Sequence, residues 1–248
     1  MKDSNRILCL TNYPSMNFVA NALLAIGASP VMSLFDKEIR ELTRWADALY
    51  INIGCLDDSQ QTAMRLAADE AFERCIPWVL DPVAVAASRQ RAELSLELIE
   101  KYRPSIIRGN ASEIRALSAL ISGTCPYDEV RCGVDSTHDS SAVLEDAKEL
   151  SKRSGATVAM SGPTDFVVTP DSVDTVSGGA AIMSEVTAMG CVASAVCTAF
   201  AATETSGREA AFKALALMKK AGAAAAGVSR GTGSFQVAFL DELSNEYR

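Results

Sequence analysis

The chain has 248 residues, of which 48% are hydrophobic and 22% charged, and its 31 acidic side chains outnumber its 23 basic ones, for a formal net charge of −8. This composition is enough to bury a substantial core, and we expect one domain over residues 1–248. An acidic chain without a basic block is unsuited to nucleic acid or anionic membrane surfaces, so we exclude both as partners.

Short β-rich apolar runs alternate along the chain with longer segments of helical periodicity. We predict strands at Ile7–Leu10, Ala48–Ile53, Trp78–Leu80, Ser105–Ile107, Thr157–Met160 and Phe166–Val168. We predict helices over residues 16–27, 36–46, 58–74, 89–102, 111–121, 141–153, 190–204, 208–227 and 234–245. The polar stretches at 84–92, 122–141 and 169–175 are expected to be surface loops. The order of strands and helices indicates a layered α/β fold with a mostly parallel central sheet and helices on both faces.

The cysteines and the single histidine limit the chemistry that is open to the chain. Its seven cysteines are scattered and never spaced as C-x-x-C, which favours reduced thiols and a cytoplasmic location. His138 lies in the polar stretch DSTHDSS and is expected to be an exposed loop residue. A site that needs several histidine ligands is therefore excluded, and a Ser-His-Asp triad would have to use His138.

Polar side chains stand where predicted strands end, which is where ligands gather in parallel sheets. Asp81 follows the run IPWVL, so its carboxylate is placed to hold Mg²⁺, although an ordinary Asp-Pro turn is the alternative. After the run PSII, Arg108 offers a guanidinium to a phosphate, and Asn110 and Glu113 offer oxygen atoms to magnesium or to its phosphate ligands. The alternative is a helix start, with Asn110 as N-cap and Glu113 completing a capping box.

The segment Ala188-Met189-Gly190-Cys191 precedes an apolar helix of small residues. Backbone N–H groups at such a helix N-terminus form a cradle for an anion, and the helix dipole adds positive charge. A cysteine in that first turn is expected to have a lowered pKa, whereas the simpler interpretation of Cys191 is a small buried hydrophobe. Ser161 closes a strand and either contacts a nucleotide or belongs to a plain turn. The sequence contains neither a Walker A motif nor G-x-G-x-x-G.

Across nearly its whole length the chain resembles the hydroxyethylthiazole kinases. The resemblance is carried in order by TNYPSMNFVANALLAIGASPVM, ALYINIG, IPWVLDPVAV, IIRGNASEI, GVDST, VTAMGC and GTGSFQVAFLDEL. It implies a ribokinase-like fold and an enzyme that uses ATP and Mg²⁺ to phosphorylate the primary alcohol of hydroxyethylthiazole in thiamine salvage. It also implies a homotrimer with active sites between subunits, in which Asn12 and its neighbours serve the site of an adjacent subunit.

The same resemblance implies roles for individual residues. The residues implied to contact ATP are Arg108, Ser161 and Asn110, and those implied to hold magnesium are Asp81 and Glu113. The residues implied to line or adjoin the thiazole pocket are Met32, Ala188, Asn12 and Gly54. Cys191, with Gly190 before it, occupies the catalytic position, where other ribokinase-like enzymes generally have an aspartate base.

The sequence departs from the family at the cradle, where AMGC stands in place of the usual G-T-G-C or G-A-G-C. Ala188 would be strained if its position requires a positive φ angle, and Met189 would add a long side chain to the cradle. Two alternatives stay open. One is a kinase of another small alcohol, of the hydroxymethylpyrimidine or pyridoxal type, and the other is a relative that binds thiazole or nucleotide without turnover.

Overall fold

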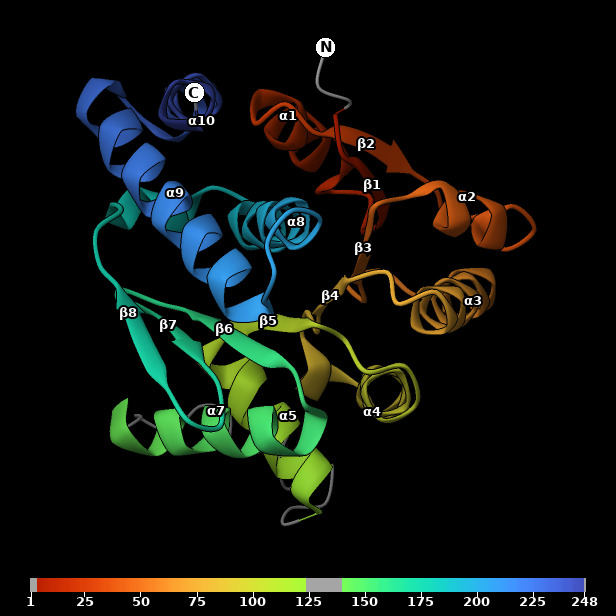
Figure 1. Ribbon diagram of the computed structural model, residues 1–248. Coiled ribbons are helices and arrows are strands. Elements are labelled where there is room, and N and C mark those ends of the chain that lie inside the picture. The colour runs from red at the N-terminus through yellow and green to blue at the C-terminus, as the bar shows by residue number, and fades with distance from the viewer. Residues whose placement is uncertain (1–3, 124–139, 248) are drawn as a thin grey trace.

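The computed structural model describes residues 4–123 and 140–247 (Figure 1). The described strands form one eight-stranded sheet in the order β2-β1-β3-β4-β5-β6-β7-β8. Their bounds are β1 (Arg6–Leu10), β2 (Ser29–Met32), β3 (Ala48–Asn52), β4 (Trp78–Asp81), β5 (Ile106–Asn110), β6 (Thr157–Ser161), β7 (Asp165–Val168) and β8 (Val173–Val176). Strands β1 to β6 pair with their neighbours in parallel. Strands β7 and β8 continue the sheet with antiparallel pairing. His138 and the motif GVDST lie outside the described residues.

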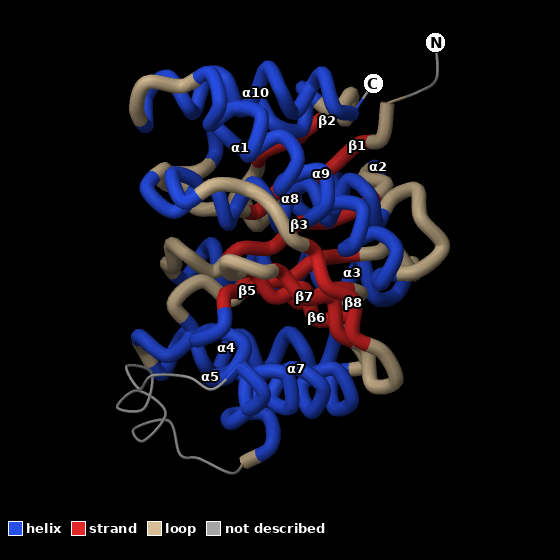
Figure 2. Tube along the Cα trace, turned by 90° about the vertical axis from the view of Figure 1, so that its left-hand side faces the viewer, coloured by secondary structure: helices blue, strands red, loops and turns tan. Residues whose placement is uncertain are grey.

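Helices cover both faces of the sheet, as Figure 2 shows from the side. One layer contains α1 (Met16–Ala25), α8 (Met189–Ala201), α9 (Gly207–Val228) and α10 (Thr232–Tyr247). The other contains α2 (Ile39–Trp45), α3 (Asp58–Glu73), α4 (Arg89–Tyr102), α5 (Ala111–Ser122) and α7 (Ser140–Ser154). Two short 3₁₀ turns, η1 (Val85–Ala87) and η2 (Ala181–Glu185), lie in the connections.

Two hydrophobic cores fill the spaces between the sheet and its helices. In β1, Ile7 and Cys9 face the core under α1 and α8, whereas Leu8 and Leu10 face the opposite core. This alternation follows from the two-residue period of a strand, and burial on both faces explains why the central strands are apolar throughout. Among the described helices, none combines the length and hydropathy needed to cross a bilayer.

The fold class, the six predicted strands and the nine predicted helices are confirmed, with ends that shift by a few residues. Two strands were missed. β2 is only four residues long and contains Pro30, and β8 lies largely in the stretch 169–175, for which the prediction of a loop was wrong. Half-exposed edge strands carry a weak hydrophobic signal, because their pairing depends on backbone hydrogen bonds to a neighbour. The predicted loop at 84–92 also contains η1 and the start of α4.

Candidate active site

Because β1 to β6 are parallel, their carboxyl ends lie along one edge of the sheet, and the polar residues of several junctions stand there in a row. The register places Asn52 of β3 opposite Asp81 of β4, and Asn110 of β5 opposite Ser161 of β6. Helix α8 packs against β3, β4 and β5, so its N-terminus lies at this row. The sheet therefore gathers groups that are far apart in the sequence.

Asp81 lies at the centre of the row, and its side chain is buried. Its Oδ2 atom accepts hydrogen bonds from the Tyr50 hydroxyl at 3.0 Å, from Nδ2 of Asn52 at 2.9 Å and from the Ser194 hydroxyl at 2.8 Å. Its Oδ1 atom is buried without a partner among the described residues. Burial raises the pKa of Asp81 to about 6, opposed by the positive charge of Arg108 and reinforced by the negative charge of Glu113.

Arg108 connects the strand ends to the N-terminus of α8. The residue is 7% exposed, and its guanidinium donates a hydrogen bond from Nη2 to Oγ of Ser161 and has a buried Nε without a partner among the described residues. A Cβ atom at Gly190 would lie 2.6 Å from Nη1 of Arg108. Only glycine therefore allows the guanidinium to approach the first turn of α8 this closely.

The first turn of α8 has the geometry of an anion cradle, with one strained residue. Ala188 is the N-cap of the helix and has φ +68°, so the strain predicted for an alanine at this position is present. The prediction that Met189 adds its side chain to the cradle was wrong. Met189 is 7% exposed and belongs to the core over this face of the sheet, so its side chain does not cover the backbone amides at the helix start.

Cys191 accepts two amide hydrogen bonds, from Nδ2 of Asn52 at 3.3 Å and from Nδ2 of Asn12 at 3.5 Å. The prediction of a lowered thiol pKa was wrong. Burial and the nearby charge of Asp81 raise the pKa of Cys191, and they outweigh the hydrogen bond from Asn12 and the charge of Arg108. Asn12 therefore contacts the thiol of its own chain.

Asn52 lies in the segment ALYINIG but has no role among the predicted site residues. Its Oδ1 atom accepts from Nδ2 of Asn12 at 2.9 Å and from the backbone N–H of Gly54 at 2.8 Å. A Cβ atom at Gly54 would lie 2.8 Å from atoms of both asparagines. Gly54 thus allows a strand-end loop to pass close to the side chains of Asn12 and Asn52, and the segment ALYINIG was the available signal.

Asn110 and Glu113 form the predicted capping box at the start of α5. Oδ1 of Asn110 accepts from the backbone N–H of Glu113 at 2.9 Å, and Oε2 of Glu113 accepts from the backbone N–H of Asn110 at 2.9 Å. Oε1 of Glu113 also accepts from the backbone N–H of Ala84 at 3.0 Å, which ties α5 to the loop after Asp81. The local helix start and the charged site are therefore built from the same residues.

Met32 lies in an open groove of about 400 Å³ beside this network. The groove is lined by residues that include Tyr13, Met16, Met32, Phe35, Asp57 and Gln60. Tyr13 follows Asn12 in the chain and is held by a hydrogen bond from Nε2 of Gln60 to its hydroxyl at 3.1 Å. At the surface of the groove, Tyr13 and Phe35 are 63% and 53% exposed.

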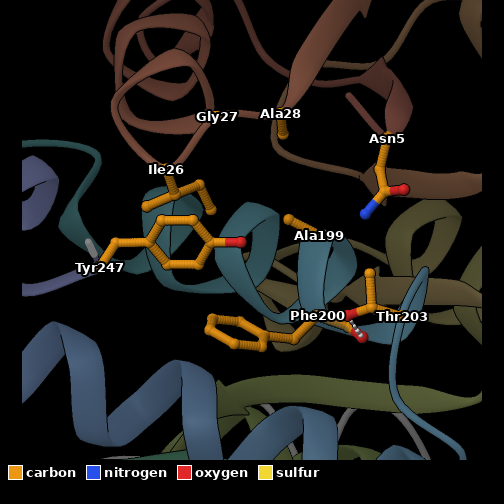
Figure 3. Close-up of a pocket in the computed structure, with 8 residues that line it drawn as sticks. All are labelled: Asn5, Ile26, Gly27, Ala28, Ala199, Phe200, Thr203 and Tyr247. Atoms are coloured by element: carbon orange, nitrogen blue, oxygen red, sulfur yellow. Dashed lines mark hydrogen bonds between the residues drawn. The ribbon is translucent and has the colours of Figure 1, made fainter. Parts of the chain in front are cut away.

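A smaller pocket lies at the other end of the sheet, between Asn5, Gly27 at the end of α1, and Tyr247 (Figure 3). Its volume of about 30 Å³ has room for a water molecule or two. It is far too small for a nucleotide or a thiazole, and it contains none of the predicted site residues.

The donor set at the strand ends fits a magnesium ion that is shared with phosphates. Magnesium is commonly held by one or two carboxylates together with phosphate oxygens and water, rather than by a cage of side chains. Within the described residues there is no cluster of three or more acidic, histidine or cysteine ligands, whereas Asp81 has a buried carboxylate oxygen that lacks a partner. Such an oxygen is suited to accept a cation or a water molecule of its hydration shell.

A mostly parallel sheet with a carboxylate, a guanidinium and a helix N-terminus at its carboxyl edge is the arrangement expected of a small-molecule kinase of the ribokinase-like class. The model of the hydroxyethylthiazole kinase family matches residues 2–246. The chain belongs to the hydroxyethylthiazole kinase family.

Individual relatives agree with this assignment. A hydroxyethylthiazole kinase of Syntrophus aciditrophicus is 44% identical over 234 residues, which cover 94% of this chain and 84% of that protein. The solved structure of a hydroxyethylthiazole kinase protein from Pyrococcus horikoshii matches with a TM-score of 0.84 and 31% identity, covering 97% of this chain and 88% of that one. A pyridoxal kinase from Staphylococcus aureus in complex with AMP-PCP matches with a TM-score of 0.67 and 15% identity, covering 89% of each chain, and shares the fold alone.

Proposed function

We propose that the chain transfers the γ-phosphoryl group of ATP to the hydroxyl of hydroxyethylthiazole at the carboxyl edge of its sheet. The observation that carries this proposal is the meeting of Arg108, Asp81 and the start of α8 at one place, supported by the family to which the chain belongs. A kinase must bind a triphosphate and stabilise the charge on the phosphoryl group during its transfer. A guanidinium, backbone amides and metal-binding carboxylates are groups that do this.

In this proposal Arg108, Ser161 and Asn110 bind ATP. The buried Nε of Arg108 has no partner among the described residues, and the amides at Gly190 and Cys191 stand at the positive end of the helix dipole. Asp81 and Glu113 would hold Mg²⁺, which neutralises charge on the phosphates when it is bound.

Cys191 orients the substrate hydroxyl in this proposal, and positioning supplies more of the acceleration than proton removal does. A phosphoryl transfer with a loose transition state asks little of a general base. The raised pKa of Cys191 keeps the thiol protonated at neutral pH, so its sulfur is a hydrogen-bonding group rather than a ready proton acceptor. Holding the hydroxyl in line with the γ-phosphoryl is then the main task of the site.

The groove beside Met32 is the proposed thiazole site, completed by a second subunit of a homotrimer. Met32 lines the groove, and Asn12, Gly54 and Ala188 are the other proposed substrate-binding residues. Support comes from the openness of the groove, from the place of Tyr13 directly after Asn12, whose amide contacts Cys191, and from the exposure of Tyr13 and Phe35 at the rim. Exposed aromatic side chains around a cavity are typical of protein interfaces. The oligomer is tested by measuring the molar mass in solution. The purified chain should have the mass of a trimer, and the Phe35→Asp variant should have the mass of a monomer.

The activity is tested by incubating the purified chain with MgATP and hydroxyethylthiazole and following the phosphorylated product by mass. A parallel screen with pyridoxal and hydroxymethylpyrimidine as substrates distinguishes a thiazole kinase from a kinase of another small alcohol. Turnover of hydroxyethylthiazole at a kcat/KM at least tenfold above those of the other alcohols is expected. Binding of thiazole and ATP in a calorimeter without product would instead establish the non-catalytic alternative.

A further inference from the structure

Lys219 of α9 is a buried cation that the proposed mechanism does not use. Its side chain is 10% exposed, and its ammonium contacts the turn between β6 and β7. Nζ lies 2.8 Å from the carbonyl oxygen of Gly162, 3.2 Å from that of Pro163 and 3.1 Å from Oδ1 of Asp165. An ammonium group has three N–H donors, so this turn satisfies all of them.

The turn that Lys219 holds is continuous with the phosphate site. Gly162 directly follows Ser161, whose hydroxyl accepts the hydrogen bond from Arg108. Oδ1 of Asp165 also accepts a hydrogen bond from the backbone N–H of Gly162 at 2.9 Å. The Lys219–Asp165 ion pair therefore connects the start of the turn, at Gly162, to its end, at Asp165. Gly162 and Pro163 are exposed, which leaves the outer side of the turn open to a ligand.

Lys219 also supports the connection that leads from β8 to the cradle. Gly178 and Gly179 both have positive φ angles, and a Cβ atom at Gly179 would lie 2.9 Å from Cδ of Lys219. The glycine pair therefore packs directly on the aliphatic part of the lysine. One side chain thus contacts both the turn after Ser161 and the segment that precedes the first turn of α8.

We propose that Lys219 is a positioning residue for the nucleotide, which sets the affinity for ATP by fixing the turn at 161–165 and the glycine pair at 178–179. This inference rests on the proposed function, because it takes the phosphate site to be that of Arg108 and Ser161. A buried ion pair contributes little net stability compared with apolar side chains of the same volume. Its contribution here is geometric, since three directed hydrogen bonds define one conformation of the turn.

The test compares Lys219→Met with Lys220→Met. The two lysines are neighbours on α9, but Lys220 is 69% exposed and pairs with Glu246 of α10, so it is the matched control. We expect Lys219→Met to raise the KM for ATP and the Kd of ADP at least tenfold, while the KM for hydroxyethylthiazole changes less than twofold. Lys220→Met should leave the KM for ATP, the Kd of ADP and the KM for hydroxyethylthiazole within twofold of the values for the unaltered chain.

A second variant separates the loss of the turn from the loss of a buried charge pair. Lys219→Met leaves the Asp165 carboxylate with the Gly162 amide as its remaining donor, whereas Lys219→Met combined with Asp165→Asn removes that uncompensated charge. The double variant should still show the tenfold weaker ADP binding with a native melting transition. An ADP affinity within twofold of the unaltered chain, or failure of both variants to fold, would overturn the inference. If the unaltered chain makes no thiazole phosphate, the proposed function fails, and the ADP titration still decides the role of Lys219.

Discussion

Nδ2 of Asn52 lies 3.3 Å from Sγ of Cys191 and donates a hydrogen bond to it. The same atom lies 2.9 Å from Oδ2 of Asp81, so one amide group connects the proposed hydroxyl-orienting thiol to the proposed metal-binding carboxylate. Tyr50 and Ser194 complete this network from β3 and α8. The position of the thiol is therefore set by hydrogen bonds to the sheet as well as by its own helix.

Cys191→Ser is expected to retain measurable activity, with kcat reduced by roughly tenfold, because a serine hydroxyl can accept the same amide hydrogen bonds and orient the same substrate. Arg108→Ala and Glu113→Gln remove charge from the site, and each should lower kcat by about a hundredfold or more. Steady-state rates of the three variants, at saturating ATP and thiazole, measure the ranking. A Cys191→Ser enzyme slower than the other two would contradict it and would give the thiol a role as the base.

Gly190→Ala is expected to displace the guanidinium of Arg108, because the added methyl group would lie 2.6 Å from Nη1. We expect kcat/KM for ATP to fall by at least tenfold, since a misplacement of this size disturbs the alignment of the phosphates. Gly227→Ala in α9 is the matched control, because a Cβ atom there meets nothing within 4 Å. Equal activity of the two variants would show that Arg108 does not need its contact with α8.

Ala188→Gly is expected to raise the free energy of unfolding by about 1 kcal/mol, because it relieves the left-handed conformation of a residue with a Cβ atom. The φ angle of +68° at Ala188 is the source of this strain. Ala223→Gly, at an exposed helical position of α9, should have the opposite effect and cost about 1 kcal/mol. Urea unfolding of both variants measures the difference, and destabilisation by Ala188→Gly would show that the alanine is unstrained.

Glu70→Gln is expected to destabilise the fold by about 2 kcal/mol at pH 7. Glu70 is buried and accepts hydrogen bonds from Arg44 at 2.7 Å, from Arg74 at 2.5 Å and from Arg40 at 3.2 Å. These arginines, Arg44 first, lower the pKa of Glu70 from 4.5 to about 2. A folded pKa below the unfolded one stabilises the native state above about pH 4.5, and this contribution is lost as the pH falls towards 2.

The difference in unfolding free energy between Glu70→Gln and the unaltered chain should therefore shrink between about pH 5 and pH 2, which denaturant titrations across that range would measure. Glu145→Gln is the control, because Glu145 is 72% exposed in its pair with Lys148 and its loss should cost less than about 0.5 kcal/mol. A difference that stays constant down to pH 2 would contradict a stabilising carboxylate at Glu70.

The capping box at Asn110 and Glu113 and the strand-end position of Asp81 could be predicted from the sequence, because both depend on neighbours within a few residues. The position of Ala188 before an apolar helix likewise identified where a strained φ angle would occur. Edge strand β8 could not be found in this way, since its pairing partner rather than its own composition defines it. The prediction of a lowered thiol pKa was wrong because it rested on the helix N-terminus, whereas burial and the charge of Asp81 raise the pKa of Cys191.

The sequence by itself determined the class of fold, the family, and which junctions carry charged groups, because periodicity and turn residues are local properties of the chain. The tertiary structure alone decided that Asn52 bridges Cys191 and Asp81, that Gly190 contacts Arg108, and that Lys219 holds the turn after Ser161. These relationships depend on which helix packs against which strand end, and that arrangement is fixed by the burial of two hydrophobic cores over the whole sheet.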